Sequence, residues 1–235
     1  MITLLQQTHF QKSRSLYNKV NEFKTFLKGQ DIDLALISET WERQNQPLDS
    51  IIKIDNFKFV SNPHQRSSST SGVRPAIFVN TSKFNVDSIN QCGHTMGCGV
   101  ISPKNVTNSS VVKRIAVCSF YSKPDSRQKI LLDHLSQTLN QLSAEFGSGL
   151  YWIIGGDKND LNIQQILNLS LAMKQCVQSP TRLKPSQILD VCITDLSSYY
   201  QSPVVIDPLQ VDIVKTGSDS GHLMVTTAPI GSESG

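Results

Sequence analysis

Polar residues of the types that hold cations or move protons stand beside short apolar stretches of this sequence. They are Glu39, Tyr121, Asp157, Asn159, Asp190 and His222. Hydrolysis of a phosphate ester requires a hard cation held by carboxylates, an oriented water molecule and a proton-handling group near the scissile oxygens. Carboxylate, amide, phenol and imidazole groups can fill those roles. The set therefore predicts a hydrolytic site for phosphate esters, provided that the fold brings its members together.

Each of these residues also has an ordinary structural interpretation. A glutamate such as Glu39 after an apolar run is usually solvated, and Gly155-Gly156-Asp157 is a sequence typical of turns. His222 precedes an apolar run, where a histidine is more often structural than catalytic. Asp190 is more informative, because a carboxylate among apolar neighbours is costly to bury unless it is paired or hydrogen-bonded.

The elements that must position these residues follow from apolar periodicity. Helical spacing occurs over residues 16–28, closed by Gly29, and over residues 130–146. Apolar runs of strand length occupy residues 32–37, 57–60, 76–79, 111–121, 151–154, 188–194 and 223–225. Helices interspersed among strands predict an α/β fold with two mixed sheets packed face to face and helices outside. A single domain over residues 1–235, with a core of about residues 2–230, suits this length.

Composition limits the setting of the protein. Hydrophobic residues make up 38% and charged residues 17%, which is a globular composition. The formal net charge is only +3, so affinity for a polyanion would depend on where Lys and Arg lie. Five cysteines without a CxxC pair indicate neither a disulfide framework nor a structural zinc. With no signal peptide and no apolar run of about 18 residues, we expect an intracellular protein, nuclear or cytoplasmic, without membrane contact.

Several motifs resemble, in order, those of the endonuclease domain of non-LTR retrotransposons, an apurinic-like member of the endonuclease/exonuclease/phosphatase superfamily. They are Lys12-Ser13-Arg14-Ser15-Leu16-Tyr17-Asn18-Lys19, Glu39-Thr40-Trp41, Tyr121-Ser122-Lys123-Pro124, Gly155-Gly156-Asp157-Lys158-Asn159, Leu189-Asp190-Val191-Cys192-Ile193-Thr194 and Ser220-Gly221-His222. An ordered series is far more specific than any single motif. The resemblance implies a four-layered α/β sandwich of the deoxyribonuclease I type.

The resemblance also implies roles for the candidate residues. Glu39 and Asp157 would ligate Mg²⁺ or Mn²⁺, and Asp157 would also position the attacking water. Asn159 and Tyr121 would contact the phosphate. Asp190 would orient His222, the proton-handling residue, because a carboxylate bonded to one imidazole nitrogen raises the basicity of the other.

Two positions depart from the family pattern. Lys12 stands where the family has Asn, and Gly221 stands where it has Asp. A fixed positive charge and a missing carboxylate both weaken cation binding. We therefore expect impaired cleavage, although Lys12 could also pair with the phosphate. Lys158 replaces a Phe of the family and matters less.

The implied function is nicking of DNA for retrotransposition, with a reverse transcriptase partner that is absent from this sequence. Candidate substrate contacts are Lys12, Arg66 and Ser220, with Arg74, Lys123 and Arg182 as further cations and the segment 64–73 as a groove-contacting loop. Two alternatives stay open: a catalytically silent nucleic-acid-binding module and a phosphatase of the same fold. The oligomeric state is not predicted.

Overall fold

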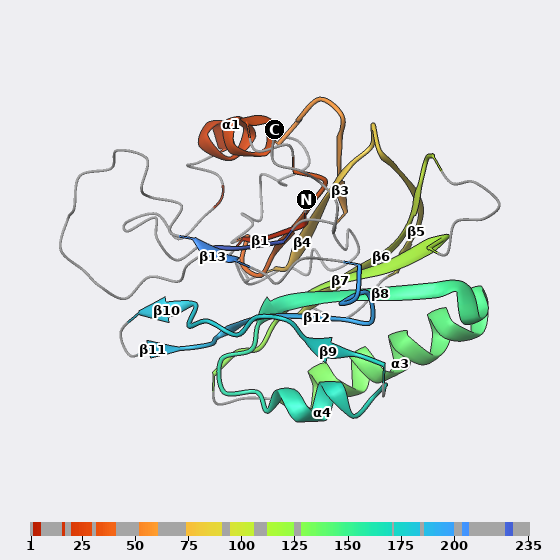
Figure 1. Ribbon diagram of the computed structural model, residues 1–235, viewed down its shortest axis with the longest axis vertical. Coiled ribbons are helices and arrows are strands. Elements are labelled where there is room, and N and C mark those ends of the chain that lie inside the picture. The colour runs from red at the N-terminus through yellow and green to blue at the C-terminus, as the bar shows by residue number, and fades with distance from the viewer. Residues whose placement is uncertain are drawn as a thin grey trace, which may run out of the picture.

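Two stacked β-sheets with helices on their outer faces form the architecture of the computed structural model (Figure 1). It describes residues 2–5, 16, 20–29, 32–40, 52–60, 74–90, 95–105, 112–124, 128–170, 172–183, 186–199, 204–206 and 224–227. Helix α1 (Val20–Gly29) lies outside one sheet, and helices α3 (Gln128–Phe146) and α4 (Ile163–Leu167) lie outside the other. The four layers are those predicted from the sequence.

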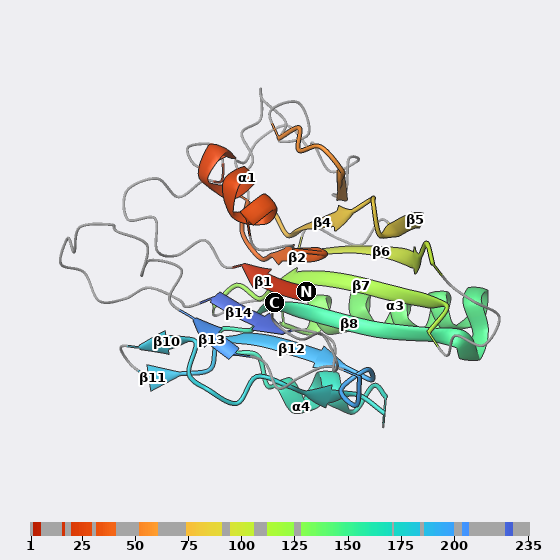
Figure 2. The same ribbon diagram turned by 45° about the horizontal axis from the view of Figure 1, so that its top comes forward.

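The first sheet has six strands in the order β13-β14-β1-β2-β4-β3. Their bounds are β13 (Val204–Ile206), β14 (Met224–Thr227), β1 (Ile2–Leu5), β2 (Leu34–Ile37), β4 (Ala76–Asn80) and β3 (Phe57–Val60). Strands β1 and β2 are parallel, and the other neighbours are antiparallel. The strands nearest the two chain ends, β1 and β14, are therefore side by side within the sheet (Figure 2).

The second sheet also has six strands, in the order β5-β6-β7-β8-β12-β9. Their bounds are β5 (Phe84–Asn90), β6 (Met96–Pro103), β7 (Arg114–Tyr121), β8 (Leu150–Asp157), β12 (Asp190–Thr194) and β9 (Lys174–Gln175). Only β7 and β8 are parallel, and α3 with the short 3₁₀ helix η3 (Gly147–Gly149) connects them. A hairpin of β10 (Arg182–Leu183) and β11 (Ser186–Gln187) precedes β12.

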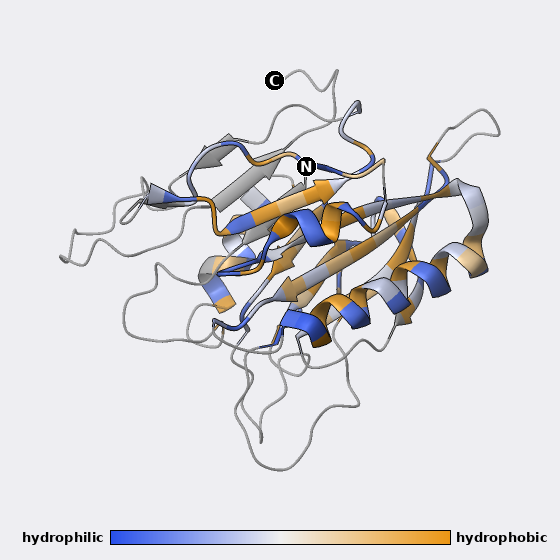
Figure 3. Cartoon of the chain, turned by 90° about the horizontal axis from the view of Figure 1, so that it is seen from below, coloured by the Kyte–Doolittle hydropathy of each residue, from blue (hydrophilic) through white to orange (hydrophobic). Residues whose placement is uncertain are grey.

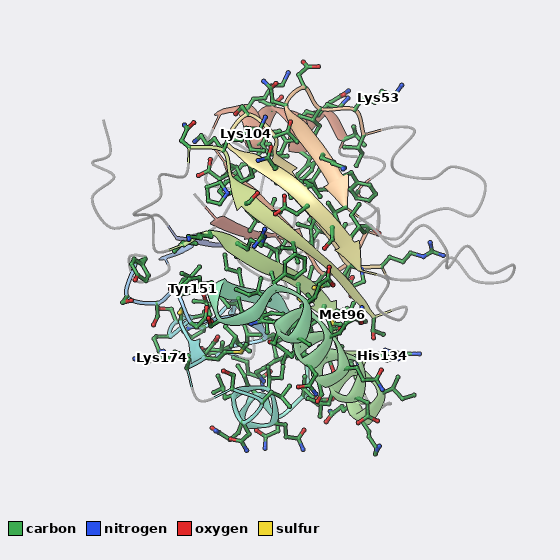
Figure 4. All side chains as sticks on the ribbon, turned by 90° about the vertical axis from the view of Figure 1, so that its right-hand side faces the viewer. Lys53, Met96, Lys104, His134, Tyr151 and Lys174 are labelled. Carbon is green, nitrogen blue, oxygen red and sulfur yellow. The ribbon has the colours of Figure 1, made fainter. Side chains whose placement is uncertain are left out.

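Side chains occupy the spaces between the layers (Figure 4), and the buried apolar ones form three clusters. One lies between α1 and the first sheet, one between the two sheets, and one between the second sheet and helices α3 and α4. The inner face of α3 contributes Leu131, Leu135, Leu139 and Leu142 to the third cluster. Figure 3 shows the apolar and polar residues that alternate along α3. This is the periodicity from which the helix was predicted.

The predicted elements are present with shifted ends, and several others were not predicted. The first helix is described from Val20 and includes Gly29 as its last residue, and its predicted apolar face is buried at Leu16, Val20, Phe23 and Leu27. Strands β1, β5 and β6 were not predicted: β1 is a mostly apolar run of only four residues, β6 contains two glycines, and β5 has polar residues at four of its seven positions. Among the described helices, none is long and apolar enough to cross a membrane.

Candidate phosphate-ester site

Three of the candidate residues lie side by side at one end of the second sheet. Tyr121, the last residue of β7, is in register with Asp157, the last residue of β8. Asp190, the first residue of β12, is in register with Asp157 from the other side. Because neighbouring strands are about 5 Å apart, this register alone places the three residues within reach of one small group. The β10–β11 hairpin projects from the end at which β12 begins (Figure 1).

Glu39 reaches the same place from the first sheet. It follows the end of β2, and its neighbour Ser38 accepts a hydrogen bond at Oγ from the backbone N–H of Asp157, at 3.0 Å. The hydroxyl group of Tyr121 is hydrogen-bonded to the Glu39 side chain. Burial raises the pKa of Tyr121 above its ordinary value, and the negative charges of Glu39 and Asp157 raise it further. Both carboxylates therefore act on one phenol group.

The carboxylate of Asp157 is held from both oxygens by Asn159. The Asn159 backbone N–H donates to Oδ1 at 2.9 Å, and its side-chain amide donates to Oδ2 at 2.9 Å and to the carbonyl oxygen of Ser122 at 2.8 Å. Asn159 adopts a positive φ of 42°, a conformation that Asn tolerates better than most residues. Asp157 is only 3% exposed, so these bonds stabilise a buried carboxylate in a fixed orientation.

Asp190 is positioned by a residue that the sequence did not single out. The fully buried Thr181 accepts hydrogen bonds at Oγ1 from the backbone N–H groups of Leu189 and Asp190, at 3.0 and 2.9 Å. These bonds fix the start of β12, whose first residue is Asp190, and the Asp190 side chain is only 4% exposed. Nothing in the local sequence marks Thr181, because its role depends on a contact made across the β10–β11 hairpin.

The Gly155-Gly156-Asp157 segment is strand, and its interpretation as a turn is wrong. Both glycines belong to β8, in register with Ser119 and Phe120 of β7. A Cβ atom on Gly156 would lie 2.1 Å from the carbonyl oxygen of Phe120. The glycine is therefore required by the close approach of β7 and β8 rather than by a reversal of the chain.

The structure places only some of the predicted substrate contacts. The carbonyl oxygen of Arg74 accepts a hydrogen bond from the N–H of Thr40 at 2.9 Å, next to Glu39, and Lys123 follows Tyr121 by two residues. Arg182 lies in the β10–β11 hairpin, where only the backbone is described. Lys12, Arg66, Ser220, Gly221, His222 and the loop 64–73 lie outside the described residues.

Glu39 and Asp157 are the described carboxylates of the candidate site that could hold a cation. Within the described ranges, no group of three or more His, Cys, Asp and Glu side chains could hold a metal. Magnesium, however, is commonly bound by one or two carboxylates together with substrate phosphate and water. The sequence-based prediction that Glu39 and Asp157 form such a pair stays a prediction at this point.

Solved structures with this fold cover nearly the whole chain. The endonuclease domain of TRAS1, a telomere-specific non-LTR retrotransposon, has a TM-score of 0.63 at 16% identity, with 95% of each chain covered. An endonuclease/exonuclease/phosphatase from Bacteroides vulgatus has a TM-score of 0.67 at 10% identity, covering 97% of this chain and 98% of its own. The mannosyl-6-phosphatase Bt3783 of Bacteroides thetaiotaomicron has a TM-score of 0.61 at 12% identity, covering 98% of this chain and 100% of its own.

Neither a protein-family model nor a curated protein matches the sequence. The structural likeness nevertheless shows the fold: this chain has the α/β sandwich of the deoxyribonuclease I type that endonuclease/exonuclease/phosphatase proteins share. The fold predicted from the motifs is confirmed.

Proposed function

We propose that this chain is a metal-dependent hydrolase that cleaves phosphodiester bonds in DNA by nicking one strand. The observation that carries the proposal is that Glu39, which follows β2 of the first sheet, meets Tyr121 and Asp157 at the end of the second sheet. Carboxylates placed together in this way are the ligands that Mg²⁺ commonly takes from a protein, with water and substrate phosphate completing its coordination.

The described residues divide the chemistry among them. Bound Mg²⁺ or Mn²⁺, held by Glu39 and Asp157, would neutralise charge on the phosphate. Asp157, held in orientation by Asn159, would accept a hydrogen bond from the attacking water. The Tyr121 phenol, which its raised pKa keeps protonated, would turn its one O–H from Glu39 to a phosphate oxygen when the substrate binds. Asp190 would orient His222, as the resemblance implies.

Reduced activity is expected because of the two departures from the family pattern. Gly221 cannot supply the carboxylate that the family has beside its histidine, and Lys12 brings a positive charge toward the cation. DNA is favoured as the substrate by the TRAS1 endonuclease domain among the structural neighbours. Arg74 and Lys123, whose backbones lie near Glu39 and Tyr121, are the cations that we assign to backbone phosphates.

A plasmid-nicking assay tests the proposal. Conversion of supercoiled plasmid to the open circle is followed with Mg²⁺, with Mn²⁺ and with EDTA. We expect metal-dependent nicking that falls about a hundredfold in Asp157→Asn. Asp160→Asn, an exposed carboxylate three residues away, should nick like the wild type. Gly221→Asp should raise nicking about tenfold or more, since it restores a carboxylate beside His222.

The outcomes separate the alternatives. Retained DNA binding in a gel-shift assay, with no nicking above His222→Ala, would indicate a silent binding module. The mannosyl-6-phosphatase among the structural neighbours favours a phosphatase as the second candidate. Hydrolysis of a soluble phosphomonoester with intact plasmid would support that candidate instead. A folded Gly221→Asp variant with neither metal binding nor nicking would show that the last motif is misassigned.

A further inference from the structure

Two serine hydroxyl groups cross the boundary between the sheets at the end of β2. Ser119 of β7 donates from Oγ to the carbonyl oxygen of Ile37 at 2.9 Å. Ser38 accepts at Oγ from the backbone N–H of Asp157 at 3.0 Å. The peptide unit between Ile37 and Ser38, immediately before Glu39, is therefore tied to β7 on one side and to the end of β8 on the other.

Both hydroxyl groups are buried in a boundary that is otherwise apolar. Ser119 is fully buried and Ser38 is 3% exposed. The cluster between the sheets consists of apolar side chains such as Leu36, Val117 and Ile153. Apolar contacts resist separation of the sheets but have little directional preference, whereas a hydrogen bond weakens steeply when its geometry changes. The serine bonds thus fix the position of β2 along the second sheet.

The position of β2 matters because the candidate site is divided between the sheets. Among the described residues, the first sheet supplies Glu39 alone. The second sheet supplies Tyr121, Asp157, Asn159 and Asp190. A slip of β2 of about 1 Å would move Glu39 relative to all the others at once, and errors of that size are costly in catalysis.

We propose that Ser38 and Ser119 are positioning residues that hold Glu39 against Tyr121 and Asp157. The inference rests on the proposed function for its catalytic meaning, but its geometric content can be measured without turnover. Ser38 acts as an acceptor and Ser119 as a donor. The loss of either hydroxyl group is therefore expected to have the same effect on Glu39, through a different strand of the second sheet.

The test uses Ser38→Ala and Ser119→Ala, with Ser88→Ala as the matched control. The Ser88 hydroxyl group is also buried, but it has no hydrogen-bond partner and lies in the edge strand β5. Protein labelled with ¹³C at tyrosine Cζ gives a Tyr121 resonance, assigned from Tyr121→Phe, that reports the hydrogen bond to Glu39. Glu39→Ala provides the resonance position for a phenol without that partner. Exchange of the Asp157 amide proton is measured in parallel.

We expect both alanine variants to move the Tyr121 resonance toward its position in Glu39→Ala. In Ser38→Ala, exchange of the Asp157 amide should also rise about tenfold, since its acceptor is lost. Ser88→Ala should leave both signals in place. Ser38→Thr, which keeps the hydroxyl group, should restore the wild-type resonance.

Unchanged signals in a folded Ser38→Ala or Ser119→Ala protein would overturn the proposal. If an alanine variant does not fold, Ser119→Cys keeps a weak donor at the same position of the side chain. It should then shift the Tyr121 resonance in the same direction by a smaller amount, and an unshifted resonance would count equally against the proposal. None of these signals requires catalysis, so an inactive protein tests the positioning role separately from the proposed function.

Discussion

Asn159 shows how one residue combines backbone and side-chain requirements. Its positive φ turns the chain back so that both its N–H and its amide face the carboxylate of Asp157. Glycine would adopt this backbone conformation but lacks the amide, and alanine lacks the amide and disfavours the conformation. The residue is therefore suited to holding Asp157 in place even before any contact with a phosphate is considered.

Gly156 is required at its position for a steric reason. The Gly156→Ala substitution would bring a Cβ atom within 2.1 Å of the Phe120 carbonyl oxygen and within 2.8 Å of the Phe120 ring. Because backbone cannot move aside as a flexible side chain does, β7 and β8 would have to separate. We expect the free energy of unfolding to fall by about 3 kcal/mol, measured by urea denaturation.

Gly149→Ala is the control for that measurement. A Cβ atom on Gly149 would have no heavy atom within 4 Å, so the change in stability should stay within about 0.5 kcal/mol. Equal stability of the two variants would contradict the close approach of β7 and β8. In that case strand packing would not explain why a glycine directly precedes Asp157.

The sequence identified the candidate residues but not what holds them. Glu39, Tyr121, Asp157 and Asp190 were found because polar types at strand ends are visible locally, and the structure brings them together. Ser38, Ser119 and Thr181 were not given roles. Each of them forms a hydrogen bond to another strand or across a hairpin, and residue type and spacing do not reveal such a contact.

At the scale of elements, the helices and the buried strands were predictable and the weak strands were not. The two long helices and strands such as β4 and β7 have continuous apolar faces. Strands β5 and β6 were missed because pairing with a neighbour, β5 with β6 and β6 with β7, supplies what their own sequences lack. The end of β8 was missed because glycines that permit close strand packing resemble glycines of a turn.

Asp195 forms a pH-dependent contact with β8, at the end of the β8–β12 pair that lies far from the candidate site. Asp195 follows β12 and accepts the backbone N–H of Trp152 at Oδ1, at 2.8 Å. Burial raises the pKa of this carboxyl group above 3.8, while the Trp152 N–H partly opposes the shift. The folded protein therefore binds this proton more tightly than the unfolded chain. The stabilising contribution is largest below the unfolded pKa and is lost as the pH rises through the folded pKa.

We expect the Asp195→Asn substitution to remove the pH dependence of stability that Asp195 contributes. Its amide oxygen can still accept from Trp152, and no charge has to be buried when the pH rises. Relative to the wild type, the variant should gain stability as the pH rises above about 4, the ordinary pKa of an aspartate, measured as the urea midpoint at each pH. Glu145→Gln, at an exposed position of α3, serves as the control. A wild-type pH profile in Asp195→Asn would contradict the burial argument.

At the scale of the whole molecule, the first sheet depends on pairing between strands that are far apart in the chain. Strand β1 lies between β14 and β2, and β14 is also the partner of β13 (Figure 2). Deleting residues 224–235 would leave β1 with an open edge in mid-sheet and β13 without its partner. Unpaired backbone groups and exposed apolar faces would result together.

We therefore expect the chain ending at residue 223 to lose cooperative thermal unfolding, measured by circular dichroism. The decrease in the free energy of unfolding should be comparable to the whole stability of a typical domain, about 5–15 kcal/mol, because the first sheet contributes to two of the three apolar clusters. Deletion of residues 228–235 alone keeps β14 and should leave the transition intact. His222 is present in both truncated chains, so a difference between them reports on the sheet and not on the candidate site. A cooperative transition at the wild-type midpoint in the shorter chain would mean that β1 does not depend on β14.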